Sequence, residues 1–405
     1  MLTAENQLLY LACSPLKNNV TQERLVSLAF EIKDWDAFLK KAAYHRLPLR
    51  LYSFLKRSRA ASFLEPQIWE KIQLASLRAQ AQVMAHEAEL KNLLPLFHQE
   101  KIELLLLKGA ALLQTVYQKN PVRALADLDL LIHRKDLDPA LALLKTMGYQ
   151  RKLDHLPSQW HERVIFSQLD QAYFPLYHPE RRVHLDLHTE AFEAPCDFNL
   201  KRDWLWENAQ GVQMDEHKTL LPNPTCLFLH SLFHLAKHRK SRENLLGWYL
   251  DLDECLGYFQ SAIEGEHCRK IIQNCPEKIL VLEVLNFIRH HFSSRLPSEL
   301  ESLIEEAKPG LISLDDILSP VKEPHADRYS LFSFYWGLIR GVRKKIWYLV
   351  RWCLPDRSYL AAKYRFGNGI EKIAAYLKHL ITMALKGVSL GIYLLRKNQH
   401  TGGKK

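Results

Sequence analysis

The feature that most constrains the fold is a change in hydrophobic pattern near residue 102. In residues 1–100 apolar positions recur every three and four residues with few β-branched side chains, which predicts helices. From residue 102 to 149, short apolar runs alternate with helical segments, and strands are expected at 102–107 and 126–133. This alternation predicts an α/β unit joined to an α-helical region.

The composition is that of an ordinary globular protein. The chain has 405 residues, of which 47% are hydrophobic and 25% charged, so it is long enough for two or three packed units. Seven cysteines occur without a CxxC pair, and the first 15 residues lack the features of a signal peptide. The longest apolar run, 380–395, contains Lys386 and is shorter than the roughly 20 residues that span a bilayer. We therefore expect a cytoplasmic protein with reduced cysteines.

The tripeptide Asp-Leu-Asp occurs three times, at 127–129, 136–138 and 251–253. The second copy precedes Pro139 and a helical run, so Asp138 is expected to be the N-cap of a helix. The third lies inside an apolar helical stretch, where residues two apart point in different directions. Neither copy is expected to clamp one ion.

The first copy differs because it falls in an expected strand. Asp127 and Asp129 would project from the same face, roughly 6 to 7 Å apart, and such a pair of charges favours a hard divalent cation such as Mg²⁺. A solvated strand end is the alternative interpretation of a lone Asp-x-Asp. The alternating run 183–188 places His184, Asp186 and His188 on one face, and so offers Asp186 as a third carboxylate.

A glycine turn precedes these carboxylates. Lys108-Gly109-Ala110 lies between an expected strand and an expected helix, where glycine lets backbone N–H groups approach a phosphate and the lysine adds a positive charge. The sequence therefore predicts a triphosphate site beside the carboxylates.

The segments LLLKGAALL, VRALADLDLLI and VHLDLH resemble the motifs of the DNA polymerase beta-like nucleotidyltransferases. They are most similar to a bacterial branch known as uncharacterised nucleotidyltransferases, although the turn here is Gly-Ala where well-studied members have Gly-Gly or Gly-Ser. The resemblance extends to 35–55, 230–256 and 354–365. It implies an α+β fold, with a small mixed-sheet nucleotidyltransferase core flanked by N- and C-terminal α-helical regions.

The resemblance also implies a mechanism and a set of site residues. Two Mg²⁺ ions, with Mn²⁺ as a substitute, would activate an unidentified acceptor hydroxyl and steady the pyrophosphate leaving group. The catalytic and metal-binding residues would be Asp127, Asp129 and Asp186. The residues expected to bind the NTP, with ATP as the leading candidate, are Lys108, Gly109, Ala110, Arg123 and His188. For Arg123, pairing with a structural carboxylate is the alternative.

Four parts are expected along the chain: an N-terminal helical region (1–100), the catalytic core (101–190), a helical domain (191–330) and a basic tail (331–405). The tail holds 15 Lys and Arg against two acidic residues. Its stretch 331–352 predicts a cationic, aromatic, amphipathic helix that either lies peripherally on the anionic inner membrane or packs on the helical body. Nucleic acid is a third candidate partner and the least favoured, because charge alone is weak evidence for it.

Two further interpretations follow. His230, His234 and His238 would share one helix face, which is compatible with a metal, but packing in a helical domain is favoured because no HExxH motif accompanies them. The family resemblance implies that this helix and the next, with Asp251, form a wall of the active cleft without a direct catalytic role. For the whole protein, a nucleotidyltransferase is favoured over a catalytically silent nucleotide-binding or scaffold protein held at the inner membrane by its tail.

Overall fold

The computed structural model describes residues 2–13, 22–151, 173–192, 198, 200, 203–240 and 244–319, and parts of 342–382. The chain forms two compact units. The first comprises residues 1–150, 173–192 and 197–322, and the second comprises 151–172, 193–196 and 323–405. The elements and sites described below belong to the first unit unless stated otherwise.

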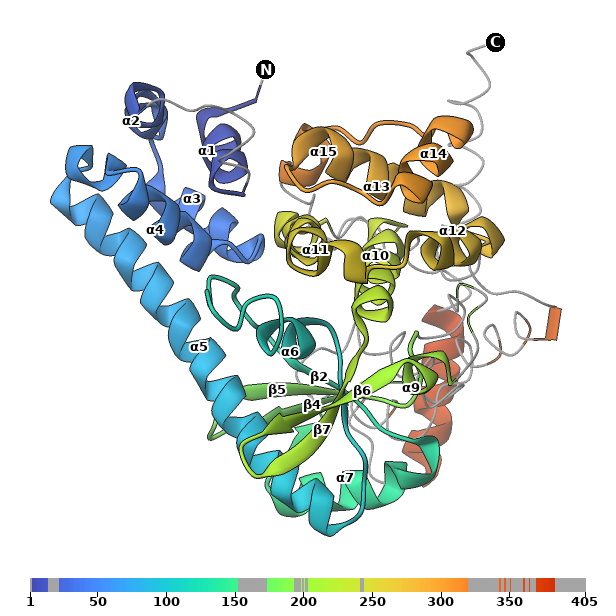
Figure 1. Cartoon of the computed structure of the whole chain (residues 1–405). Helices are drawn as coiled ribbons and strands as arrows, with labels where there is room; N and C mark the ends of the chain where they lie inside the picture. The colour runs from blue at the N-terminus through green and yellow to red at the C-terminus, as the bar shows by residue number, and fades with distance from the viewer. Residues whose placement is uncertain are drawn as a thin grey trace. The chain divides into compact units, whose positions relative to one another are not determined.

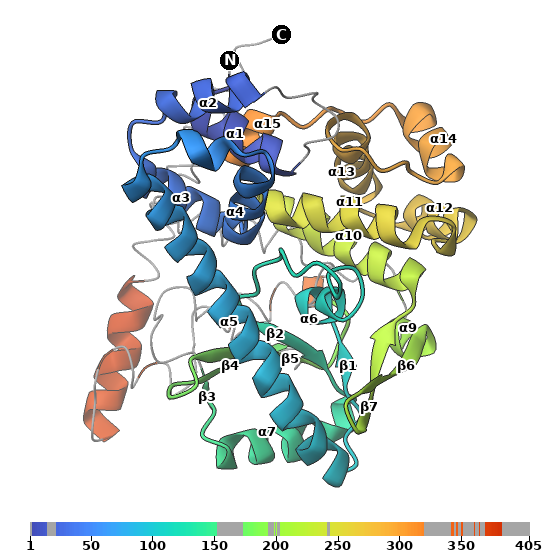
Figure 2. The ribbon, with the colours of Figure 1, turned by 60° about the vertical axis from the view of Figure 1, so that its left-hand side comes forward.

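Within the described residues, five α-helices precede the sheet, as the three-and-four periodicity predicted. They are α1 (Ala4–Cys13), α2 (Gln22–Glu31), α3 (Trp35–Tyr44), α4 (Pro48–Arg57) and α5 (Pro66–Gln99). Helix α3 begins where the Asp34 side chain accepts a hydrogen bond from the Ala37 N–H at 2.9 Å. Helices α4 and α5 each begin with proline, which has no N–H to leave unsatisfied. Helix α5 runs diagonally across the sheet and contacts β5 (Val183–His188) and β7 (His217–Pro222) (Figure 2).

The sheet is mixed, as expected. Its order is β3-β4-β5-β2-β1-β7-β6. Besides β5 and β7, the strands are β1 (Leu105–Leu106), β2 (Leu128–Leu131), β3 (Gln150–Arg151), β4 (Tyr173–His178) and β6 (Ala209–Met214). Pairs β2–β5 and β1–β7 are parallel, whereas β1–β2, β4–β5 and β6–β7 are antiparallel. The sheet extends beyond the expected core of 101–190, because the β6–β7 hairpin adds to β1.

Two local predictions need correction. The strand expected at 126–133 is confined to β2, so Asp127 precedes it. The helix expected to be capped by Asp138 is α7 (Leu137–Thr146), whose N-cap is Asp136. Asp138 is therefore inside the first turn, together with Pro139. Proline is tolerated there because first-turn N–H groups have no intrahelical partner.

The remaining helices of the unit lie on the other side of α6 from the sheet (Figure 1). They are α10 (Pro224–Lys240), α11 (Leu246–Phe259), α12 (Gly265–Asn274), α13 (Lys278–His291), α14 (Ser298–Ala307) and α15 (Leu314–Leu318); the short α6 (Lys108–Leu113) and α9 (Trp204–Glu207) are closer to the strands. Helix α10 contacts both α6 and β7, so it connects the helices to the sheet.

The N-terminal helix docks against the C-terminal helices of the same unit. The Tyr10 hydroxyl donates to the His291 carbonyl at 2.9 Å, and the Asn6 amide donates to Asp315 Oδ1 at 3.4 Å. Leu8 and Leu9 of α1 are fully buried. The first and last helices of the unit therefore share one core.

The expected amphipathic stretch 331–352 lies almost entirely outside the described residues. Its four described residues, Val342, Arg343, Ile346 and Val350, are helical, and all are exposed. In the part of the chain that the structure describes, no helix is both long and apolar enough to cross a bilayer.

Candidate active site

Two carboxylates and an imidazole converge on one face of the sheet. The parallel register pairs Asp129 of β2 with Asp186 of β5, and His188 follows two residues later on the same face. Leu128 and Leu130 alternate to the opposite face and are buried. One ligand atom from each of Asp129, Asp186 and His188 lies within 4.8 Å of the other two. The two-residue period of each strand and the register between the strands thus bring these three side chains together.

Asp129 is the centre of this cluster. It is only 3% exposed, accepts a hydrogen bond from Lys108 Nζ at 2.6 Å and lies 3.0 Å from His188 Nε2, all through Oδ1. Burial by itself would raise the pKa of Asp129, but Lys108 and His188 hold it below its ordinary value. Burial likewise lowers the pKa of Lys108, but the charges of Asp129, Asp186 and Asp127 raise it overall. The site therefore holds an ionised carboxylate and a charged lysine.

Lys108 opens α6 directly after β1 with a φ of +45°, in the left-handed region. A side chain is held there only where its surroundings compensate the strain, and such residues are common at functional sites. The Leu107 N–H donates to the Asp129 carbonyl at 3.0 Å, which fixes the turn to β2. Ala110, one of the predicted nucleotide-binding residues, is 2% exposed.

Asp127 is placed differently from the prediction. It is half-buried just before β2 and is not part of the three-residue cluster. Its charge nevertheless acts on Lys108 and on His86 of α5. Asp127 is therefore close to the site, but the strand alternation that aligns Asp129 with Asp186 does not extend to it.

Arg123 forms an ion pair with a carboxylate of the helical region. Its Nε and Nη2 donate to Asp251 of α11 at 2.9 to 3.1 Å, and the Tyr117 hydroxyl donates to the same carboxylate at 2.9 Å. Both partners of the ion pair are buried, with side chains 9% and 6% exposed. This arrangement corresponds to the alternative interpretation of Arg123, pairing with a protein carboxylate.

The three histidines of α10 do not gather around one point. His230 is fully buried, with its Nε2 3.2 Å from the Ala191 carbonyl, and burial and then the charge of Lys108 lower its pKa to about 3. His234 and His238 instead pack their rings against Trp248, at centroid distances of 5.0 and 4.8 Å. Packing, the favoured interpretation, accounts for these contacts.

Two residues of the site's surroundings, Tyr117 and His86, were not predicted as site residues, and Asp251 was expected only in a wall of the active cleft. Asp251 lies 128 residues from Arg123, so only the tertiary structure pairs them. The available signal was its place in a helix that resembles the family. His86 is fully buried on the face of α5 that packs against the sheet, and helical periodicity does not distinguish it from a packing residue.

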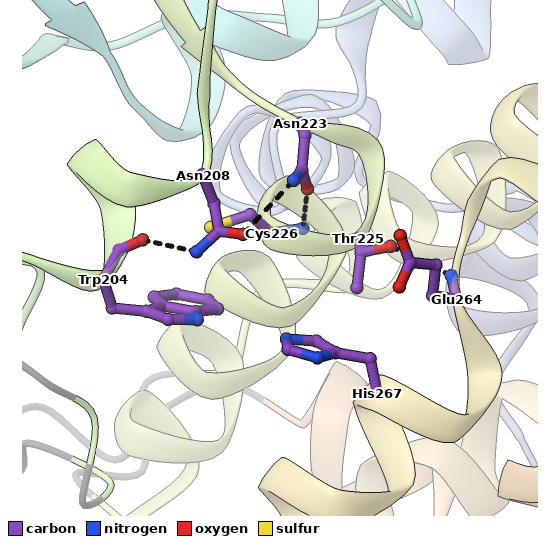
Figure 3. Close-up of a pocket in the computed structure, with 7 residues that line it drawn as sticks. All are labelled: Trp204, Asn208, Asn223, Thr225, Cys226, Glu264 and His267. Carbon is purple, nitrogen blue, oxygen red and sulfur yellow. Dashed lines mark hydrogen bonds between the residues drawn. The ribbon is translucent and has the colours of Figure 1, made fainter.

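A separate pocket lies at the starts of α10 and α12 (Figure 3). Its polar groups are mostly engaged with one another: Asn208 Nδ2 donates to the Trp204 carbonyl at 2.8 Å, and Asn223 Oδ1 accepts from the Cys226 N–H at 2.8 Å. Thr225 likewise accepts from the Glu264 N–H. These bonds satisfy helix-terminal groups, so the pocket is explained as a structural junction.

The donor set of the candidate site fits a divalent metal. Asp129 and Asp186 offer the carboxylate oxygens that Mg²⁺ and Mn²⁺ prefer, and His188 adds a nitrogen that Mn²⁺ accepts more readily than Mg²⁺. Lys108 binds Oδ1 of Asp129, one of the two oxygens that this carboxylate offers a metal. The residues therefore fit the ion, in competition with the lysine.

Comparison with known protein families identifies a match over most of the chain. A model of the family described as uncharacterised nucleotidyltransferase matches residues 31–293, which include the sheet, the cluster and the Arg123–Asp251 pair. No curated protein matches the chain.

Proposed function

Because the chain belongs to the uncharacterised nucleotidyltransferase family, we propose that this site transfers a nucleoside monophosphate from an NTP to an acceptor hydroxyl. The observation that carries the proposal is the convergence of Asp129, Asp186 and His188 beside the charged Lys108. Two Mg²⁺ ions, or Mn²⁺ in their place, are proposed at Asp127, Asp129 and Asp186, where they would polarise the triphosphate and lower the pKa of the acceptor hydroxyl.

The reaction balances as a displacement at the α-phosphorus. The acceptor oxygen forms a new P–O bond, the bond to the β-phosphate oxygen breaks, and pyrophosphate leaves with the bonding electrons. Asp186, half-buried at the edge of the cluster, accepts the acceptor proton. Lys108 neutralises phosphate charge, and His188 orients Asp129 through their 3.0 Å contact.

The test uses NTPs labelled at the α- or the γ-phosphate, incubated with the protein, Mg²⁺ and a cell extract. Only the α-label should enter a product, because nucleotidyl transfer releases the γ-phosphate in pyrophosphate. Asp129→Asn should abolish labelling. Asp138→Asn is the matched control, because Asp138 is the last residue of another Asp-Leu-Asp copy but is exposed on α7. Labelling that persists in Asp129→Asn argues against the mechanism.

One observation favours the rival function, a catalytically silent nucleotide-binding or scaffold protein at the inner membrane. The two cations predicted to meet phosphate, Lys108 and Arg123, both bind carboxylates of the protein itself. This rival predicts NTP binding without α-label transfer. The exposed Val342, Ile346 and Val350, in a tail with 15 basic residues, support its membrane contact.

A further inference from the structure

The Arg123–Asp251 pair connects α11 to the turn before the active site. Asp251 Oδ1 receives Tyr117 and Arg123 Nε, and Oδ2 receives Arg123 Nη2. A planar guanidinium held at two oxygens has little rotational freedom, so its plane is fixed relative to α11.

The same guanidinium lies against Gly109. A Cβ added to Gly109 would be 2.5 Å from Leu125 Cδ1 and 3.0 Å from Arg123 Cζ, and closer still to Arg123 Nη1. Real Cβ atoms essentially never come closer than 3.0 Å to a non-bonded heavy atom, so a side chain at 109 would have to displace Leu125 Cδ1 and the guanidinium that Asp251 holds. The glycine thus leaves room for Arg123, whatever a phosphate requires on the other side of the turn.

The turn connects the Arg123–Gly109 contact to the cluster of Asp129, Asp186 and His188. Gly109 directly follows Lys108, whose left-handed φ of +45° needs support from its surroundings. Lys108 in turn donates to Asp129. A continuous set of contacts therefore runs from Asp251 through Arg123, Gly109 and Lys108 to the catalytic carboxylate.

We propose that Asp251 is a positioning residue, which holds Arg123 against Gly109 and so fixes the Lys108 turn in the conformation that receives the triphosphate. This inference rests on the proposed function, because it assumes that the turn binds NTP. It gives Arg123 a role behind the turn in place of direct phosphate contact. It also makes α11 a part of the nucleotide site, although α11 itself would not contact the nucleotide.

The first experiment compares Asp251→Asn with Asp253→Asn in the full chain. The two aspartates are matched because both lie on α11 and are buried, with exposed fractions of 5% and 8%. Asp253 accepts a hydrogen bond from the Ser294 N–H at 2.9 Å, and Ser294 is far in sequence from the Lys108 turn. The probe is a methylene-bridged ATP analogue with Mn²⁺, titrated calorimetrically. Asp251→Asn should weaken the analogue about tenfold, equivalent to about 1.4 kcal/mol. Asp253→Asn should change the affinity less than about twofold, even if both variants lose similar thermal stability.

The second experiment is a double-mutant cycle of Gly109→Ala and Arg123→Ala. In the wild-type background the added methyl meets the guanidinium, so Gly109→Ala should weaken the analogue about tenfold. In the Arg123→Ala background the guanidinium is gone, and the remaining neighbour, Leu125 Cδ1, is the end of a flexible side chain that can shift, so the same substitution should cost less than about threefold. The comparison of asparagine variants remains available if Arg123→Ala does not fold.

The outcomes separate the two proposals. Equal affinity losses in Asp251→Asn and Asp253→Asn overturn the positioning role. An equal effect of Gly109→Ala in both backgrounds overturns it too, because the glycine then does not act through Arg123. If the wild-type protein binds no analogue with Mn²⁺, the proposed function itself fails, and this inference fails with it.

Discussion

Replacing Lys108 by methionine tests whether the lysine and a divalent metal compete for one carboxylate. The Nζ–Oδ1 separation is 2.6 Å, so two unit charges at an effective dielectric constant of about 20 attract by about 6 kcal/mol before desolvation is subtracted. Removing one partner of a buried pair costs about 3 to 5 kcal/mol, and Lys108 is 21% exposed, which reduces the effect. We therefore expect the free energy of unfolding to fall by about 2 to 4 kcal/mol in EDTA.

The same substitution should improve metal binding. Without the competing ammonium, Mn²⁺ should bind the nucleotide-free protein about tenfold more tightly, and Mn²⁺ at 100 times its Kd should restore about 2.7 kcal/mol of stability. Urea unfolding with EDTA or Mn²⁺, together with calorimetric Mn²⁺ titration, measures both effects. Lys135→Met, at an exposed position shortly after β2, is the control. Mn²⁺ affinity equal to or weaker than wild type would refute the competition.

Three other perturbations have defined outcomes. Burial and then the charge of Lys41 lower the pKa of His45 to about 4, below its unfolded value of about 6.5, so the stability it contributes is present above pH 6.5 and is lost as the pH falls toward 4. The free energy of unfolding in urea should therefore fall by about 2 kcal/mol less between pH 7 and pH 5 in His45→Asn than in wild type. An equal fall in the two proteins contradicts the lowered pKa of His45. Arg181→Ala removes two 2.7 Å hydrogen bonds from the buried Glu89 and should lower the free energy of unfolding, measured by thermal unfolding, by about 1 to 3 kcal/mol. A decrease no larger than that of Arg182→Ala would show that the pair does not stabilise the fold. The full chain should sediment with anionic vesicles at low salt and a chain ending at residue 330 should not; equal sedimentation of the two removes the membrane role of the tail.

Local sequence evidence predicted part of the cluster. In VHLDLH the two-residue period of a strand places Asp186 and His188 on one face, and in ADLDLLI it indicated Asp129 as a strand residue, so Asp186 could be expected as a third carboxylate. The convergence of the two strands follows from the parallel pairing of β2 with β5. The change in periodicity near residue 102 predicted an α/β unit beside helices, whereas the α+β class was implied by the family resemblance.

The rest depended on contacts between distant segments. Asp127 was expected in the strand, but β2 begins one residue later, and strand ends are not determined by alternation alone. The partner of Arg123 is 128 residues away, and several acidic residues of the helical region were equally plausible from sequence. The glycine of the turn was expected to serve a phosphate, and only the packed structure reveals the guanidinium against it.

The docking of α1 on α13 and α15 affects how the chain folds during its synthesis. Leu8 and Leu9 are synthesised about 300 residues before the partners of α1 at His291 and Asp315. At about 5 to 20 residues per second, the delay is roughly 15 to 60 s. During that time α1 can pack only on α2 and α4, and its surface toward α13 and α15 stays uncovered, so nascent chains are expected to engage chaperones at this surface. A chain cut at residue 190 would leave that surface permanently uncovered, and would also lack β7, the parallel neighbour of β1.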